Sequence, residues 1–266
     1  MKYGFIGTGN MGGAIARALV KSVPKENVYL SNRNMEKAEK LAIELGAKTS
    51  SNIEIAADCD MIFLGVKPQF MAGVLCSLKD TLKERKGEFV LVSMAAALTI
   101  NDIKEFAGGD YGVIRIMPNT PVSVGEGMIL YAADDRVSED MLGAFLDAMK
   151  FAGRLDELDE KLIDAGSVVS GCGPAFAYMF AEALADGGVE CGLPRAKAQE
   201  YAAQMLIGAG KLLLESGESP GTLKDNVCSP GGSTIAGVHA LEENGFRGAV
   251  NEAVIAAFKR TVELGK

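Results

Sequence analysis

Five short apolar runs are spaced along the first part of this chain. They read KYGFIG, NVYLS, DMIFLGV, EFVLVSM and GVIRIMP, at residues 2–7, 27–31, 60–66, 88–94 and 112–118. Each run is continuous rather than alternating, as expected for strands buried on both faces of a sheet. Amphipathic runs lie between them. One of these, NMEKAEKLAIELG, places Ala38, Leu41, Ala42 and Leu45 on one helical face and ends at Gly46, a residue typical of helix C-termini. The alternation of strand and helix predicts a parallel, doubly wound α/β sheet with right-handed crossovers.

From Glu160 onward the pattern changes to helices rich in Ala and Gly, with breaks near residues 187–188, 192–194 and 217–221 and no convincing strand. The change predicts two domains, residues 1–158 and an all-α domain over residues 159–266. Several of these helices are apolar over more than one face, which a bundle of this length cannot bury alone, so we expect a second chain to cover the remainder. The least charged stretch, residues 165–181, is broken by Gly and Pro and is shorter than the ~20 residues of a spanning helix. We expect it to be a buried helix.

Composition narrows the function further. The chain has 266 residues, a formal charge of −8 and no basic run, which argues against nucleic-acid binding. Its five cysteines form no CxxC pair, and it opens directly into an apolar strand, so we expect a cytoplasmic protein without a membrane partner. The single histidine, His239, lies beside Val238 in a helical run, where a structural role is commoner than a catalytic one. No Cys, His and carboxylate group shows metal-ligand spacing, so neither a zinc site nor a histidine-based triad is expected.

The first strand leads into GFIGTGNMGGAIARAL, in which Gly7, Gly9 and Gly12 have the spacing G-x-G-x-x-G. After a strand and at the start of a helix this motif predicts dinucleotide binding. The first glycine permits a tight turn, the second lets backbone amides reach a pyrophosphate, and the third allows close packing of helix and strand. Glycine turns before helices are common by themselves, so the prediction depends on the strand and helix pattern that follows.

The end of the second strand reads Ser31, Asn32, Arg33. A carboxylate here would bind the ribose of NAD, whereas the planar guanidinium of Arg33 suits the 2′-phosphate of NADP. NADPH is therefore the expected cofactor, with NADH as the alternative if Arg33 is only a solvated surface residue.

Two further strand ends should face the same crevice, because ligands of open α/β sheets bind beyond the carboxyl ends of the strands. They are VKPQ, residues 66–69, and SMAA, residues 93–96. Pro68 restricts the backbone of Lys67 to an extended conformation, which would hold Lys67 at the nicotinamide pocket. From the residues alone, Lys67 is equally well explained as a turn lysine.

Residues 228–237, CSPGGSTIAG, place a proline, two glycines and two hydroxyls before a helical run. This arrangement fits an ordinary helix cap, and it also fits a cradle in which free amides bind an anion. The segment by itself does not decide between the two.

Several stretches together resemble the pyrroline-5-carboxylate reductase family nearly from end to end. They are GFIGTGNMGGAIA, FLGVKPQ, RIMPNTPVSVGEG, and two longer segments at residues 159–198 and 223–250 that contain SGCGPAFAYMFAEALADGGVECGLPRAKA and LKDNVCSPGGSTIAGVHALEENGFRGAV. The resemblance implies hydride transfer from a nicotinamide to the C=N carbon of Δ1-pyrroline-5-carboxylate, giving L-proline in the last step of its biosynthesis. It also implies a helical C-terminal domain that interlocks with a second subunit, so a homodimer or a larger homo-oligomer is expected.

The resemblance also carries over site residues. The implied cofactor contacts are Gly7, Thr8, Gly9, Asn10, Met11, Asn32, Arg33, Asn52, Val66, Lys67, Pro68, Gln69, Met94, Ala95, Ala96 and, from the helical domain, Asn226. The implied substrate contacts are Glu160, Ser233 and Thr234, and the helix-start argument adds Gly231 and Gly232, whose amides would face the substrate carboxylate.

Thr234 is the expected catalytic residue. A hydroxyl is a poor acid, so we expect Thr234 to position the substrate and hydrogen-bond to it more than to protonate it. The chain departs from the family at Cys172, where SGSGPA is usual, and at Ser233, where PGGTT is commoner than PGGST. The cysteine is small enough to preserve packing, and Ser233 keeps its backbone amide.

Two other functions compete with this one. The β-hydroxyacid dehydrogenases also join a glycine-rich nucleotide domain to a helical one, but they need a catalytic lysine on a helix that here reads PAFAYMFAEALA. A cofactor-sensing regulator without turnover is the second alternative, and the acidic composition and absence of a DNA-binding motif count against it.

Overall fold

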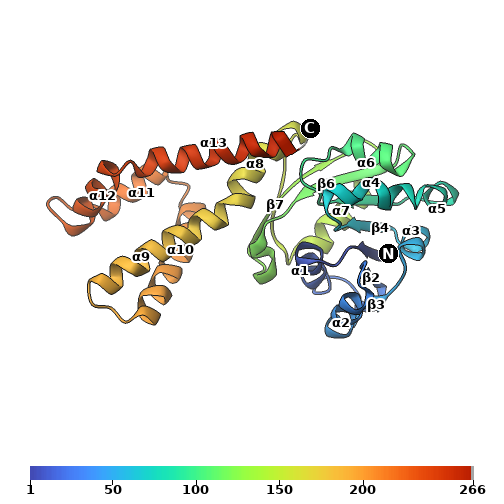
Figure 1. Cartoon of the computed structure of the whole chain (residues 1–266), viewed down its shortest axis with the longest axis horizontal. Helices are drawn as coiled ribbons and strands as arrows, with labels where there is room; N and C mark the ends of the chain where they lie inside the picture. Colours follow the sequence, from blue (N-terminus) through green and yellow to red (C-terminus); the bar gives the residue numbers. More distant parts are fainter. Residues whose placement is uncertain (265–266) are drawn as a thin grey trace. The chain divides into compact units, whose positions relative to one another are not determined.

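The computed structural model describes residues 1–264 and divides into two compact units (Figure 1). Met1–Cys172 and the C-terminal segment from Ala257 form the first unit, and Gly173–Ala256 forms the second. The predicted boundary between residues 158 and 159 falls at the end of the last strand, whereas the compact units divide one short helix later. The division into domains 1–158 and 159–266 therefore stays a prediction.

The first unit contains one eight-stranded sheet in the order β3-β2-β1-β4-β5-β6-β7-β8. The strands are β1 Tyr3–Ile6, β2 Val28–Ser31, β3 Lys48–Thr49, β4 Met61–Leu64, β5 Val90–Ser93, β6 Gly112–Met117, β7 Gly127–Ala133 and β8 Gly153–Glu157. The strand order reverses between β1 and β4, the point at which open α/β sheets bind their ligands. The predicted nucleotide-binding architecture is confirmed, and each of the five predicted strands is present.

The five predicted strands are parallel to one another, and the sheet departs from parallel pairing only at β7, a strand that the sequence did not predict. β7 runs antiparallel to β6, with Ile116 opposite Tyr131, while all other neighbours are parallel. The connection, residues 118–126, holds only the short 3-10 helix Thr120–Val124. A parallel crossover needs about a dozen residues or more, so this connection can only return the chain in the opposite direction.

Helices cover both faces of the sheet. On one face lie α1 Asn10–Leu19, α2 Met35–Leu45 and α7 Glu139–Met149, and on the other α3 Asn52–Asp58, α4 Pro68–Cys76, α5 Lys79–Glu84, α6 Ile100–Ala107 and α8 Glu160–Ser167. Successive strand residues point to opposite faces, so Phe5 and Phe63 stack at 4.5 Å in the first core while Ile6 and Leu64 lie in the second.

The predicted helix with Ala38, Leu41, Ala42 and Leu45 on its buried face is α2. It ends at Gly46, which has the left-handed backbone (φ 71°) that favours glycine. Sequence periodicity and the glycine stop are therefore both confirmed for this element.

The second unit is all-helical, as the change of pattern after Glu160 predicts. It contains α9 Gly173–Glu190, α10 Arg195–Ser216, α11 Pro220–Val227, α12 Ser233–Glu243 and the first part of α13 Phe246–Leu264, whose last residues belong to the first unit. α9 and α10 pack side by side (Figure 1), and their buried residues are small: Ala185, Ala198 and Ala202. Small residues let two helix backbones approach closely.

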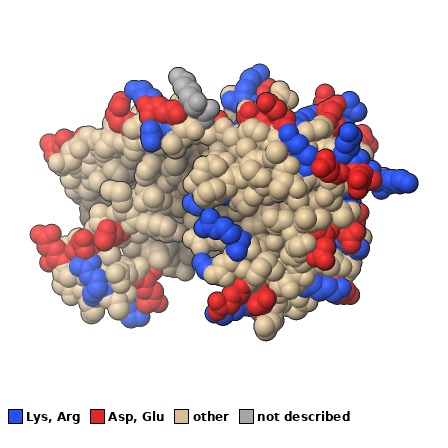
Figure 2. Space-filling view, turned by 45° about the vertical axis from the view of Figure 1, so that its right-hand side comes forward, with Lys and Arg blue, Asp and Glu red and all other residues tan. Residues whose placement is uncertain are grey.

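The prediction that residues 165–181 form a buried helix was wrong for the single chain. A turn of π-helix at Val168–Cys172 joins α8 to α9, and the outer residues Tyr178 and Met179 are 64% and 69% exposed. Within residues 1–264, the continuous helix Glu160–Glu190 is long and apolar enough to cross a membrane by length and composition, with 11% of its most apolar window buried. In the view of Figure 2, charged side chains of both signs border broad areas of uncharged surface.

Candidate active site

The turn after β1 has the tight geometry that its glycines predict. Gly7 has φ 98°, and a Cβ there would lie 2.7 Å from the backbone of Gly65. A Cβ on Gly12 would lie 2.2 Å from the carbonyl oxygen of Gly7. Contacts below about 3 Å with backbone atoms cannot be relieved by a rotamer change, so α1 approaches the turn as closely as it does only because both positions are glycine.

Space and hydrogen-bond donors for an anion remain at the same turn. A Cβ on Gly9 would meet no atom within 4 Å, so the packing of the protein does not require glycine at this position. Gly9 is the N-cap of α1 and supplies no side-chain cap to the first amides of the helix. The buried hydroxyl of Thr8 has no partner among residues 1–264. Free amides, an unpaired hydroxyl and an open approach fit a dinucleotide pyrophosphate.

The second strand ends beside this turn, because β2 neighbours β1 in the sheet. Ser31 donates its hydroxyl to the Asn52 side chain at 2.6 Å, and Asn52 is the first residue of α3. Arg33 is exposed and lies over the ring of Phe70 at 5.5 Å, a cation–π distance. The ring holds the guanidinium close to the edge of the sheet where a ribose phosphate would lie.

The other predicted cofactor segments follow β4 and β5. Lys67 has the extended backbone expected before proline (φ −62°, ψ 144°), and Pro68 is the first residue of α4. After β5, Met94–Ala96 leads to Ala97, which has the unusual value φ 62° for a residue with a Cβ. Such strained backbone is typical of functional loops. The predicted cofactor residues of the first unit follow the ends of the adjacent strands β2, β1, β4 and β5, except for Asn52, which follows β3 and accepts the hydrogen bond from Ser31 at the end of β2.

The remaining predicted contacts lie in the second unit. Asn226 is near the C-terminal end of α11, and Ser233 and Thr234 are the first two residues of α12. Gly231 has φ 68°, and a Cβ on Gly232 would lie 2.3 Å from the Ser229 hydroxyl oxygen. Gly232 is the N-cap of α12, and no side chain caps its amides. The helix therefore begins with free donors, as an anion cradle requires.

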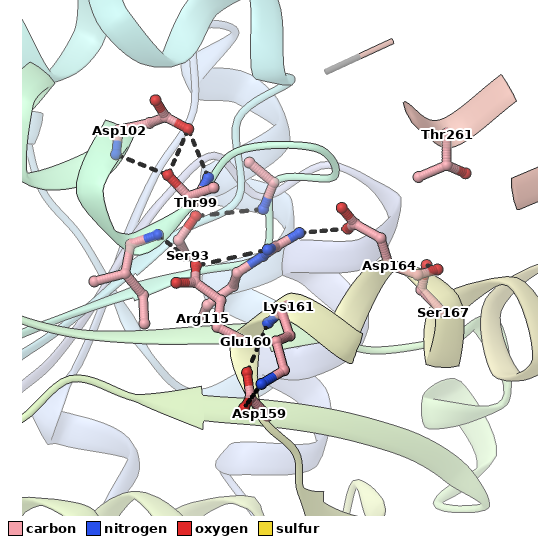
Figure 3. A network of polar contacts seen from close by, with 12 residues as sticks. Ser93, Thr99, Asp102, Arg115, Asp159, Glu160, Lys161, Asp164, Ser167 and Thr261 are labelled. Carbon is pink, nitrogen blue, oxygen red and sulfur yellow. Dashed lines mark hydrogen bonds and ion pairs between the residues drawn. The ribbon is translucent and has the colours of Figure 1, made fainter. Parts of the chain in front are cut away.

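Glu160 belongs to the first unit, where it is part of a polar cluster (Figure 3). It is the first residue of α8, and its Oε1 accepts a hydrogen bond from the backbone amide of Ile100 at 2.6 Å. The same oxygen lies 3.6 Å from Nη1 of Arg115, whose Nη2 donates to Asp164 at 2.5 Å. The carboxylate is therefore held by two other elements, α6 and β6.

Arg115 and Asp164 were missed by the sequence analysis. Arg115 is an isolated charge inside the apolar run GVIRIMP, and Asp164 lies one helical turn after Glu160. A charge within a buried strand needs a partner of opposite sign, so this pattern could have indicated the cluster.

Cys172, which stands where the family usually has a serine, lies at the end of the π-helical turn, and its thiol is half-buried. Next to it, the carbonyl of Ser170 accepts a hydrogen bond from the buried side chain of Asn119 at 2.9 Å. Asn119 also accepts from the Met128 amide at 2.9 Å. The turn is thus fixed through Ser170.

His239 is exposed on α12 and lies 3.2 Å from Glu243 on the same helix. This is a surface pair on one helix and not part of the cluster around Glu160.

A largely parallel sheet with an anion-receptive glycine turn at its switch point, followed by a helical unit, is the architecture of a dinucleotide-dependent oxidoreductase. Two family models match the chain: one described as NADP oxidoreductase, coenzyme F420-dependent, over residues 2–97, and one described as pyrroline-5-carboxylate reductase dimerisation, over residues 160–264. The chain belongs to the pyrroline-5-carboxylate reductase family.

Full-length relatives support this assignment. Pyrroline-5-carboxylate reductase 3 of Danio rerio is 41% identical over 100% of this chain and 92% of its own. The solved pyrroline-5-carboxylate reductase of Coxiella burnetii is 30% identical with a TM-score of 0.91, covering 100% of this chain and 98% of that one. The pyrroline carboxylate reductase of Plasmodium falciparum, solved with NADP bound, is 33% identical with a TM-score of 0.87 over the same shares. These comparisons confirm the family indicated by the sequence.

Proposed function

We propose that this protein reduces Δ1-pyrroline-5-carboxylate to L-proline with NADPH, the last step of proline biosynthesis. Family membership over the whole chain supports the reaction, and the uncapped start of α12 is the observation that carries it. A substrate with a carboxylate next to a C=N bond needs an anion site that leaves the imine accessible. The amides after Gly231 and Gly232 provide donors without side chains in the way.

The glycine turn and the neighbouring strand ends hold the cofactor in this proposal. Gly7 to Met11 take the pyrophosphate, Arg33 with Asn32 takes the 2′-phosphate, and the segments 66–69 and 94–96 border the nicotinamide, with Asn52 and Asn226 as further contacts. The bound nicotinamide supplies the hydride. Arg33 favours NADPH over NADH because a planar guanidinium makes charge-assisted, paired hydrogen bonds to a phosphate.

The residues of the chain then have two tasks, orientation and proton supply. The α12 amides hold the carboxylate so that the imine carbon faces the hydride, which is chiefly an effect of proximity. Reduction of the C=N bond adds a hydride to carbon and leaves the electron pair on nitrogen. A substrate that binds as the iminium already carries the nitrogen proton, whereas a neutral imine takes one from the Thr234 hydroxyl or from an ordered water. Thr234 hydrogen-bonds to the nitrogen and orients it, and Glu160 is the acidic substrate contact.

The oligomer in this proposal is an interlocked homodimer in the cytoplasm, with neither nucleic acid nor membrane as a partner. The apolar side chains along α9 and α10 support it, since Tyr178, Met179 and Tyr201 are exposed in the single chain. The dimerisation family model covers these helices. A second copy of the chain is therefore the proposed cover for the long apolar helix Glu160–Glu190.

Turnover with purified protein tests the proposal directly. We expect NADPH absorbance to fall when Δ1-pyrroline-5-carboxylate is added and L-proline to accumulate in equal amount. The control is a panel of hydroxyacids with NADP⁺, which a β-hydroxyacid dehydrogenase would oxidise. Oxidation of a hydroxyacid without reduction of the imine would contradict the proposal, and tight cofactor binding without any turnover would favour the regulator.

A further inference from the structure

The cluster of Arg115, Glu160 and Asp164 contains a buried charge with an unusual environment (Figure 3). The Arg115 side chain is 3% exposed, although it lies in the middle of β6. Its two Nη atoms face Glu160 and Asp164, and its Nε has no partner among residues 1–264. A buried ion pair often contributes less to stability than an apolar side chain of the same size would. Core packing therefore does not explain why an arginine lies here.

The two acceptors lie one turn apart on α8. Like charges at positions i and i+4 of a helix repel each other, so Glu160 and Asp164 would tend to turn apart without a cation between them. Both side chains are 31% exposed and could move into solvent. The guanidinium lies behind both carboxylates and holds them on one face of the helix.

Glu160 faces further negative charge on its open side. A pocket of about 600 Å³ in the first unit is lined by Asp134, Asp135, Glu157 and Asp159 as well as Glu160. No lysine or arginine lines this pocket in the described part of the chain. Lys104 pairs with Asp134 and Lys161 pairs with Asp159, each at 2.8 Å. The like charge that acts on Glu160 therefore comes mainly from Asp135 and Glu157, and the contact with Arg115 opposes this repulsion.

The contacts that hold Glu160 use only one of its oxygens. The Ile100 amide and the Arg115 guanidinium both reach Oε1. The orientation of the carboxylate is fixed in this way, and Oε2 is left for a ligand. In the sheet, Arg115 is also the direct neighbour of Ser93, which precedes the cofactor segment Met94–Ala96.

We propose that Arg115, steadied by Asp164, is a positioning residue that fixes the Glu160 carboxylate for its contact with the substrate. This inference rests on the proposed function, because it takes Glu160 to be a substrate contact. Arg115 acts through Glu160 and does not itself touch the substrate.

A double-mutant cycle between Arg115 and Glu160 tests the inference. We expect Arg115→Met to lower kcat/KM for pyrroline-5-carboxylate by up to about a hundredfold, the effect of a misplaced contact, with the KM for NADPH unchanged. In a Glu160→Gln background the same change should have almost no further effect. Arg115→Lys should recover part of the activity, since it restores the charge without the forked geometry. The matched control is Arg154→Met, which removes an exposed arginine from the neighbouring part of the sheet.

Equal losses from Arg115→Met in both backgrounds would overturn the inference, as would a loss that merely follows a lower melting temperature. If Arg115→Met does not fold, Asp164→Asn takes its place in the cycle. Asp164→Asn keeps the shape of the side chain. It should lower kcat/KM by less than Arg115→Met does, and this effect should also vanish in the Glu160→Gln background. Additive losses in kcat/KM would count against the inference. A wild-type protein without pyrroline-5-carboxylate turnover would contradict the proposed function itself, which separates the two failures.

Discussion

At the scale of single residues, Gly9 and Gly12 differ in what a side chain would meet. A Cβ at Gly9 enters open space, whereas one at Gly12 would lie 2.2 Å from the Gly7 carbonyl oxygen. We expect Gly9→Ala to melt like the wild type but to raise the KM for NADPH by about tenfold, a loss of about 1.4 kcal/mol. Gly12→Ala should lower the melting temperature, because overpacking costs typically about 1–3 kcal/mol.

Thermal melts and NADPH titrations of the two variants check this contrast. The prediction fails if Gly9→Ala unfolds early with unchanged cofactor affinity, since the glycine would then serve the fold rather than the ligand.

Thr234 allows a second test at this scale. It is the second residue of α12 and is exposed in the single chain. We expect Thr234→Ala to lower kcat by about tenfold or more, the effect of one lost hydrogen bond of roughly 1.5 kcal/mol, while NADPH binding stays near the wild-type value. Thr234→Ser keeps the hydroxyl and should retain most of the activity. Steady-state kinetics of both variants decide the matter, and an unchanged kcat in Thr234→Ala would remove the residue from the mechanism.

Residue-scale prediction from sequence succeeded where a backbone constraint is visible in the residue type. The turn at Gly7, the extended Lys67 before Pro68 and the stop at Gly46 are such cases. It failed for Arg115, because the partners of a charge come from elements that the sequence does not place in space. Asp164 and the Ile100 amide meet Arg115 and Glu160 only once α6, β6 and α8 are packed.

At the scale of elements, the strands that were predicted are those buried on both faces. β8, GRLDE, and β3, Lys48–Thr49, are largely exposed strands at the two edges of the sheet, so they lack the continuous apolar run that marks the central ones. β7 is apolar enough to have been recognised, but its direction depends on the short connection before it. Edge strands and reversals of chain direction can therefore be assigned only from the assembled sheet.

The packing of α3 under β1 gives an element-scale prediction about pH. Cys59 ends α3 and is 1% exposed, and a Cβ on Gly4 of β1 would lie 2.9 Å from its sulfur. Burial raises the pKa of the Cys59 thiol to about 12. An unfolded thiol has a pKa of about 8.5, so the stabilising contribution is complete below that pH. It is lost as the pH rises toward 12, because the unfolded chain releases its proton first.

We therefore expect the free energy of unfolding of the wild type to fall more steeply above about pH 8.5 than that of Cys59→Ala, as measured by urea denaturation across the alkaline range. Iodoacetamide should modify the exposed Cys76 and Cys191 in the native protein and reach Cys59 only in urea. Native labelling of Cys59 would show that α3 opens readily and would contradict the argument.

At the scale of the whole molecule, the two units differ in how much of their apolar surface is buried within one chain. The first unit buries large side chains on both faces of its sheet, such as Phe5, Phe63 and Phe145 on one face and Ile62 and Leu91 on the other. The second buries little beyond alanines and leaves tyrosine, methionine and leucine exposed. Sequence patterning predicted this surplus of apolar faces. It could not predict that most of residues 165–181 is not fully buried in the single chain, because the sequence does not show which of these surfaces a second chain would cover.

The exposed apolar side chains of the second unit predict that the protein assembles through α9. Met179 on α9 is 69% exposed, and Ile43 on α2 is 84% exposed but belongs to the sheet-containing unit. If a second copy covers α9, Met179→Glu would bury an unpaired carboxylate at the interface, which is strongly unfavourable. Light scattering after size exclusion should then show a dimer or larger assembly for the wild type and for Ile43→Glu, and a smaller species for Met179→Glu. Reductase activity should fall with the assembly, since a helical unit that packs so little within one chain needs its partner to stay ordered. A wild-type protein that is fully active as a monomer would exclude the interlocked dimer.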